Sequence, residues 1–159
     1  MAKKEEKTNV MRLLDAKKLP YRTRTYDPQV AVAGQDVAAL LGEDTPRVFK
    51  TLVTVGKSGA HYVFMVPVNR ELELKKAARA AGEKSVEMIK SRELLPLTGY
   101  IHGGCSPIGM KKLFPTFADE SAREFDTIFF SAGKVGFQVE LAPADLEKML
   151  PVTFADIAE

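Results

Sequence analysis

The pattern of hydrophobic and polar positions switches repeatedly between a helical period and a strand period. Val10, Leu13 and Leu14 recur at helical spacing behind Thr8, a typical cap residue, whereas residues 48–55 are almost continuously apolar. The pattern predicts helices over residues 8–18, 37–41, 72–81, 91–95 and 143–150. It predicts strands over residues 21–26, 48–55, 61–68, 113–117, 127–131 and 137–141, with 85–88 as a further candidate.

Glycine and proline mark where these elements end. Gly42 and Gly82 stand where left-handed caps are expected, and Pro96 is expected to end the helix 91–95. Residues 56–59 have the glycine spacing of a hairpin turn, so the strands on either side should pair antiparallel. Because helices and strands do not alternate regularly, we predict an α+β fold in which short helices surround a mixed, mostly antiparallel, curled or barrel-like sheet of six to seven strands.

Length and composition predict one domain, residues 8–159, behind a flexible N-terminal tail of residues 1–7. The chain has 159 residues, of which 45% are hydrophobic and 28% charged, and no apolar run is long enough to span a bilayer. The opening residues are charged with no apolar segment behind them, so we expect no secretory signal, no membrane contact and a cytoplasmic location. The net charge of +2 is too small to indicate nucleic-acid binding, so any RNA contact must be local.

Cysteine and histidine are scarce. Cys105 is the single cysteine, which excludes an internal disulfide and a cysteine-based metal cluster. His61 and His102 lie far apart without a carboxylate–histidine motif, so we expect neither a metal nor a cofactor. A nucleophilic Cys105 would need an oriented base, and no Asn, Asp or Glu stands out to orient His102. The role of a buried, small apolar residue is therefore favoured for Cys105.

One lysine interrupts the apolar strand 48–55. Period-two alternation places Lys50 on the same face as Val48 and Leu52. An ammonium group is costly to bury without a partner. Lys50 therefore either lines a cleft in which it meets an anion or lies at a sheet edge, where it discourages aggregation. The strand by itself leaves both interpretations open.

Two glycine-rich segments are further candidates for chemistry. The glycines of the loop 103–109 let the backbone approach a ligand closely, and free N–H groups there can form an anion nest or an oxyanion hole. The alternative is a structural turn held by Pro107. Residues 131–134 place a serine and a lysine on a glycine turn, which belongs either to a binding site or to a solvated hairpin.

Taken together, three motifs resemble one protein family. The segments 48–52 (VFKTL), 103–109 (GGCSPIG) and 131–134 (SAGK) occur in the order and spacing typical of the YbaK/EbsC family, and the likeness covers nearly the whole chain. Members of that family are free-standing aminoacyl-tRNA deacylases related to the editing domain inserted in bacterial prolyl-tRNA synthetases. The resemblance implies an enzyme that releases a mischarged amino acid, most often cysteine, from proline tRNA.

The resemblance also implies roles for individual residues. The implied catalytic group consists of Lys50, Gly103 and Gly104. The implied substrate-binding residues are Tyr26, Thr51, Ser106, Pro107, Ser131, Gly133 and Gln138. Family members often carry a pocket aromatic residue and an aspartate where this chain has Ala33 and Gln138. Those two departures leave the released amino acid open.

The family's chemistry needs no nucleophile from the protein. In its cysteine-specific members the thiol of the substrate attacks its own carbonyl, and such intramolecular attack can reach an effective molarity of about 10⁵ M or more. Backbone donors from Gly103 to Pro107 would stabilise the developing oxyanion. Lys50 would hold the phosphate or ribose of the terminal adenosine, or lower the pKa of the thiol.

The implied partners are mischarged tRNA(Pro) and prolyl-tRNA synthetase, beside which relatives can act. Lys111, Lys112 and Lys134 are candidates for a basic rim around the acceptor end of the tRNA. Two alternatives stay open: a deacylase for alanine or another small amino acid, and a non-catalytic module of the same fold that binds tRNA or the synthetase.

Overall fold

The computed structural model describes residues 7–31 and 33–159. The expected tail of residues 1–7 lies outside these ranges except for Lys7, whose Nζ is 2.6 Å from Asp15 Oδ2. The helices are α1 (Asn9–Ala16), α2 (Gly34–Leu41), α3 (Leu74–Ala81), α4 (Ser91–Thr98) and α5 (Pro143–Met149), with 3₁₀ turns η1 (Thr45–Arg47) and η2 (Glu120–Glu124). The strands are β1 (Arg22–Thr25), β2 (Phe49–Gly56), β3 (His61–Pro67), β4 (Val86–Met88), β5 (Thr116–Asp119), β6 (Ile128–Ser131), β7 (Phe137–Leu141) and β8 (Val152–Ala155).

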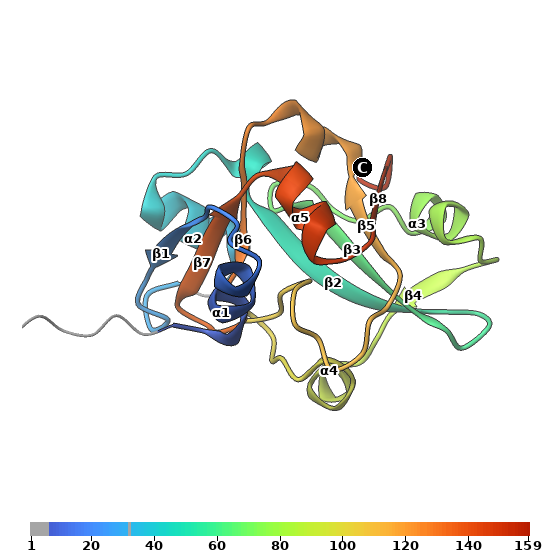
Figure 1. Cartoon of the computed structure of the whole chain (residues 1–159). Coiled ribbons are helices and arrows are strands. Elements are labelled where there is room, and N and C mark those ends of the chain that lie inside the picture. The colour runs from blue at the N-terminus through green and yellow to red at the C-terminus, as the bar shows by residue number, and fades with distance from the viewer. Residues whose placement is uncertain (1–6, 32) are drawn as a thin grey trace, which may run out of the picture.

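The strands form two sheets. One has the order β4-β2-β3-β5-β8 and the other the order β1-β7-β6, and a single bridge between Val48 and Phe129 joins them. Only β5 pairs in parallel fashion, with β3 and with β8, and the other described pairs are antiparallel. Figure 1 shows β2 and β3 crossing the centre of the molecule, with the smaller sheet, α1 and α2 at one end and α3 at the other. The predicted α+β class with mixed, mostly antiparallel pairing is confirmed, but the strands are divided between two sheets where one was predicted.

Three sequence predictions about the elements are wrong in detail. The described residues contain eight strands, not six or seven, because β8 pairs with β5. Strand β5 starts at Thr116 and not at Leu113, since Pro115 has no N–H to donate and only its carbonyl oxygen joins the ladder, accepting from Val63 N at 2.9 Å. Helix α4 continues through Pro96, because the bonds that close its last turn, Gly99 N to Leu95 O and Thr98 Oγ1 to Leu94 O, do not use the missing N–H.

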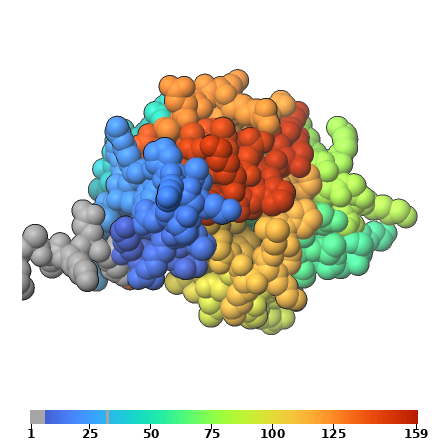
Figure 2. Space-filling model, in the orientation of Figure 1, coloured from blue at the N-terminus to red at the C-terminus, as the bar shows by residue number. Residues whose placement is uncertain are grey.

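The β2–β3 hairpin separates two hydrophobic clusters. On one face Phe49 and Met65 pack with α1, α5 and the smaller sheet, and on the other Phe64 and Val66 pack with α3. On the face of the molecule drawn in Figure 2, the surface of the N-terminal part of the chain (blue) lies beside that of its C-terminal part (red). Lys50 pairs with Val66 near the open end of the hairpin, as the antiparallel prediction requires. In the described ranges no helix is long and apolar enough to cross a membrane.

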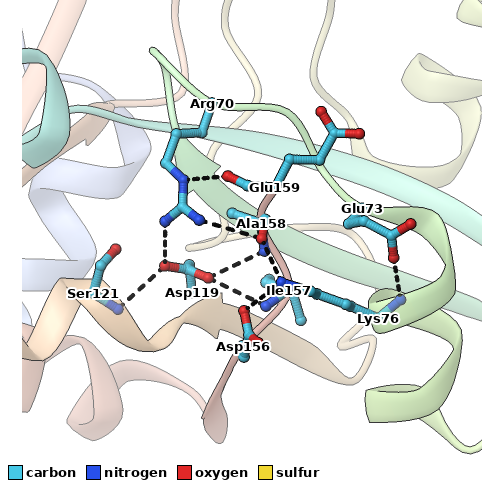
Figure 3. Close-up of polar contacts among 9 residues, drawn as sticks. All are labelled: Arg70, Glu73, Lys76, Asp119, Ser121, Asp156, Ile157, Ala158 and Glu159. Atoms are coloured by element: carbon cyan, nitrogen blue, oxygen red, sulfur yellow. Dashed lines mark hydrogen bonds and ion pairs between the residues drawn. The ribbon is translucent and has the colours of Figure 1, made fainter.

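A polar cluster around Asp119 ties residues 156–159 to the segment after β3 (Figure 3). The Asp119 carboxylate accepts backbone N–H bonds from Ile157 and Ala158 through Oδ1 and from Ser121 through Oδ2, each at 3.2 Å. Arg70 adds a fourth contact, Nη1 to Oδ2 at 3.4 Å, and also donates to the carbonyl oxygens of Ala158 and Glu159 at 3.2 and 2.6 Å. Every polar atom of the Asp119 carboxylate is therefore used inside the fold.

Candidate active site

A cavity of about 410 Å³ lies where the first residues of β2 meet α2, the loop 102–105 and the adjoining ends of β6 and β7. Its volume is in the range of small-molecule sites. All of residues 48–52 contribute to its wall. Of the residues implied by the family resemblance, it is lined by Tyr26, Lys50, Thr51, Gly103, Ser131 and Gln138. The structure does not place Gly104, Ser106, Pro107 or Gly133 in the wall.

Lys50 lies at the mouth of the cavity. Its Nζ is 3.3 Å from Glu71 Oε2, and the two side chains are 26% and 72% exposed. The Lys50 ammonium is thus paired with a carboxylate that is itself largely exposed to solvent. Strand β4 pairs with β2 only at residues 54–56, so at Lys50 the ladder is formed with β3 alone. The place of Lys50 in the cavity wall supports the cleft interpretation of this lysine.

Two buried side-chain atoms in the cavity wall have no hydrogen-bond partner among the described residues. They are Thr51 Oγ1 and Gln138 Oε1, and both are buried. Most buried polar atoms in folded proteins are paired, so unpaired ones beside a cavity commonly mark a place for a ligand or an ordered water. Residues 51 and 138 are therefore the wall positions best suited to receive a polar group of a substrate.

The first two glycines of the loop 103–109 differ in whether their N–H groups are bonded. Gly103 has φ 86°, a left-handed conformation that favours glycine, and its N–H has no partner among the described residues. The Gly104 N–H donates to Ile101 O at 3.0 Å and is thereby used inside the loop. A Cβ on Gly104 would lie 3.0 Å from Val135 N, so this glycine lets the loop pack against the 131–136 turn.

The remaining motif residues support the wall from behind. Ser131 Oγ accepts from Gly133 N at 3.1 Å, and a Cβ on Gly133 would lie 2.9 Å from Val10 Cγ2, so Gly133 permits close packing against α1. Ser106 is buried, and its Oγ accepts from Ile108 N at 3.4 Å. Pro107 lines a separate, smaller cavity. These contacts support the structural alternative for the 103–109 loop beyond Gly103.

Cys105 and His102 both line the cavity. Burial raises the pKa of the Cys105 thiol to about 12, which leaves almost no thiolate at neutral pH. The predicted role of a buried apolar residue for Cys105 agrees with its place beside Val53 and Val63. In the part of the chain that the structure describes, no three His, Cys, Asp or Glu side chains come together as a metal site would require.

A buried carboxylate lies behind the Gln138 wall. The Glu43 side chain is 1% exposed, its Oε2 is 3.7 Å from Arg24 Nε, and neither of its oxygens has a hydrogen-bond partner among the described residues. Burial raises the pKa of Glu43, and the nearby Gln138 amide and Arg24 guanidinium lower it by less. Arg24 lies opposite Gln138 on the neighbouring strand, so these groups form one cross-strand row that ends at the cavity.

Sequence reasoning missed Glu71 and Glu43. A signal for Glu71 was present, because an antiparallel hairpin returns β3 to the start of β2, and the residues after β3 must then lie near Lys50. Nothing comparable marked Glu43, which follows the predicted helix cap Gly42 in a polar segment. Its side chain lies near Arg24 of β1 and Gln138 of β7, which are distant from it in the sequence.

Comparison with known proteins gives a consistent group of relatives. Residues 27–149 match the family described as "Aminoacyl-tRNA editing domain". The chain is 46% identical, over 99% of its length and 98% of the relative's, to an Enterococcus faecalis protein named "Putative Cys-tRNA(Pro)/Cys-tRNA(Cys) deacylase EbsC". It is 30% identical over 62% of its length to 17% of the proline–tRNA ligase of Fervidobacterium nodosum.

Solved structures share the fold. One described as a "putative trans-editing enzyme for prolyl tRNA synthetase" superposes with a TM-score of 0.83 over 97% of this chain and 99% of that one, at 23% identity. Another, described as "hypothetical protein APE2540", has a TM-score of 0.85 over 94% of this chain and 99% of that one, also at 23% identity. At this level of identity the likeness establishes the architecture.

Proposed function

The chain belongs to the aminoacyl-tRNA editing domain family, and from this premise we propose that it is a trans-editing deacylase that releases a mischarged amino acid, above all cysteine, from tRNA(Pro). The name of the Enterococcus faecalis relative supports the substrate class. The similarity to part of a proline–tRNA ligase supports prolyl-tRNA synthetase as a partner beside which the protein works.

The observation that carries the proposal is the convergence of three distant segments on one cavity. Residues 48–52, Gly103 and Ser131 are far apart in sequence and line the same space of about 410 Å³. That space holds one lysine, the unpaired N–H of Gly103 and two unpaired polar side-chain atoms. A cation beside neutral donors and acceptors suits a polar ester carried on an anionic polymer.

The chemistry proposed for this cavity is substrate-assisted. The thiol of a cysteinyl ester attacks the carbonyl carbon of the same residue, the ester C–O bond breaks, and the ribose hydroxyl of the tRNA leaves with a proton. The products are free tRNA and a cyclic thiolactone. The Gly103 N–H is the proposed donor to the developing oxyanion, a contact of a kind that contributes about 10² to 10³ in rate.

The decisive experiment is Lys50→Ala assayed on Cys-tRNA(Pro). We expect kcat/KM to fall at least about 10²-fold while the unfolding midpoint stays near that of the wild type, because a charge-assisted contact is lost from a side chain that is not part of the core. Lys57→Ala is the matched control, since Lys57 is an exposed lysine on the turn at the other end of β2. An unchanged rate in the Lys50 variant would refute the assignment.

The amino acid released is tested by a panel of tRNAs charged with cysteine, alanine and proline. Ala33, which stands at the cavity where relatives often carry an aromatic residue, leaves room for side chains other than cysteine. Faster release of alanine than of cysteine would favour the alternative of an alanine deacylase. Binding of charged tRNA without any release would favour a non-catalytic module.

A further inference from the structure

Glu71 is the ion-pair partner of Lys50. The Glu71 side chain is mostly exposed, so packing does not hold it beside Lys50. The side chain is 72% exposed, yet its Oε2 is 3.3 Å from Lys50 Nζ at the mouth of the cavity. Glu71 and Asp36 are the acidic residues in the described cavity wall. A carboxylate with so much solvent around it is free to leave when another anion arrives.

The backbone of Glu71 is held by residues 157–159. Glu159 N donates to Glu71 O at 2.9 Å, and Leu72 forms an antiparallel bridge with Ala158. On the other side of Glu71, Arg70 donates to the carbonyl oxygens of Ala158 and Glu159 and contacts Asp119 (Figure 3). The contact of Arg70 with Asp119 and the bridge between Leu72 and Ala158 thus fix the backbone on either side of Glu71, and with it the region that the Glu71 carboxylate can reach.

We propose that Glu71 is an internal stand-in for the substrate, a carboxylate that occupies in the free protein the place at which Lys50 receives a phosphate of the tRNA 3′ end. This inference rests on the proposed deacylase function and assigns Lys50 to the phosphate and not to the reacting thiol. Arg70 is then a positioning residue that acts through Glu71.

The position of the ion pair favours a phosphate over the reacting group. Carboxylate and phosphate oxygens make the same kind of contact with an ammonium group, so a site that accepts one accepts the other. The pair lies at the mouth, where Glu71 is mostly exposed, whereas the unpaired N–H of Gly103 and the buried Thr51 hydroxyl offer neutral contacts for an ester. A phosphate must follow the esterified ribose outward, which brings it to Lys50.

The test uses two small esters, 3′-O-cysteinyl adenosine with and without a 5′-phosphate. In the wild type the phosphorylated ester should have the lower KM. In Glu71→Gln its KM should fall by a further factor of about 2 to 5, the range expected when an exposed ion-pair competitor is removed, and the KM of the unphosphorylated ester should stay the same. Equal effects on both esters, or a higher KM for the phosphorylated one, would overturn the proposal.

Glu87→Gln is the matched control. Glu87 is also exposed and carries the same charge, but it pairs with Val55 at the far end of β2. It corrects for the general gain that a polyanionic or phosphorylated substrate obtains when any acidic residue is lost. A decrease in KM of the same size in Glu87→Gln would also refute a specific role for Glu71.

Arg70→Lys tests the positioning part while keeping a positive charge beside Asp119. A lysine lacks the planar fork that reaches two carbonyl oxygens, so it should hold Glu71 less firmly beside Lys50. Glu71 then competes less with the phosphate, and the KM of the phosphorylated ester should fall, by less than in Glu71→Gln. In a Glu71→Gln background the same change should have no further effect on KM. An equal effect in both backgrounds would remove Arg70 from the proposal.

The two esters also separate this inference from the proposed function. If neither the esters nor any charged tRNA loses its amino acid, the proposed function fails. If the esters lose their amino acid but Glu71→Gln does not distinguish the phosphorylated ester from the other, only the role of Glu71 fails.

Discussion

Asp119 and Glu43 are both buried carboxylates, and the fold treats them in opposite ways. Asp119 is 2% exposed and accepts three backbone N–H bonds and a contact from Arg70, whereas Glu43 is 1% exposed and has no hydrogen-bond partner among the described residues. Burial by itself acts to raise the pKa of both groups. At Asp119 the bonds from Ser121, Ile157 and Ala158 outweigh burial and lower the pKa, and at Glu43 burial prevails.

This difference separates the scaffold from the site. The Asp119 cluster is fully bonded and joins β5, the segment after β3 and residues 157–159, so it acts as a structural element. The region around Glu43, Gln138 and Thr51 keeps unpaired polar atoms, and two of these three residues line the cavity. Natural proteins leave buried polar atoms without hydrogen bonds mainly where function requires it.

The largest effect expected from this comparison is that of Asp119→Ala. We expect a loss of about 3 to 5 kcal/mol in the free energy of unfolding, because three buried N–H groups and Arg70 lose their acceptor. Asp156→Ala is the control, since Asp156 forms only a solvated ion pair with Lys76 and should cost less than about 1 kcal/mol. Denaturant unfolding measures both values. Similar losses would mean that the Asp119 cluster is not the structural element described above.

A smaller effect is expected in the pH dependence of stability. Glu43 binds its proton more tightly in the folded state, so stability should rise as the pH falls through the window above its ordinary pKa of 4.5. Asp119 binds its proton less tightly, so stability should fall as the pH drops below its ordinary pKa of 3.8. Each group can contribute a slope of at most about 1.4 kcal/mol per pH unit. The free energy of unfolding, measured at a series of pH values, should depend less on pH above about 4.5 in Glu43→Gln than in the wild type. In Asp119→Asn it should depend less on pH below about 3.8.

The smallest effect is expected for Glu43→Gln at neutral pH. The variant should be about 1 kcal/mol more stable than the wild type, because it removes a buried charge that accepts no hydrogen bond and whose ion-pair partner, Arg24, stays partly exposed to water. Leu146→Ala, which truncates a fully buried side chain, shows the scale of a loss in the same assay. A marked loss of stability in Glu43→Gln would mean that the carboxylate has a partner that the comparison with Asp119 overlooks.

Much of the fold followed from local rules. Thr8 caps α1 by accepting from Met11 N, Gly42 and Gly82 end their helices in the left-handed conformation, and the β2–β3 hairpin has the predicted antiparallel pairing. These features depend on residues close together in sequence. Strand β8 escaped prediction because its pairing with β5 brings together segments more than thirty residues apart.

The site divides in the same manner. Its motifs were visible in the sequence, and the family membership that they indicated is confirmed. The functions assigned to Lys50, Gly103 and the substrate-binding residues stay predictions. Four of the predicted site residues lie outside the cavity wall: Gly104, Ser106, Pro107 and Gly133. The motifs could not predict this, because a motif records which residues occur together and not which of their atoms face a ligand.

The sequence by itself determined the class of fold, the hairpin that carries Lys50 and the family, because alternation, caps and motif spacing are properties of neighbouring residues. Only the tertiary structure decided that Glu71 meets Lys50, that Gly103 and not Gly104 has a free N–H, and that Asp119 is fully bonded while Glu43 is not. Each of these depends on which distant backbone and side-chain atoms come within a few ångströms, and burial and hydrogen bonding follow from that packing.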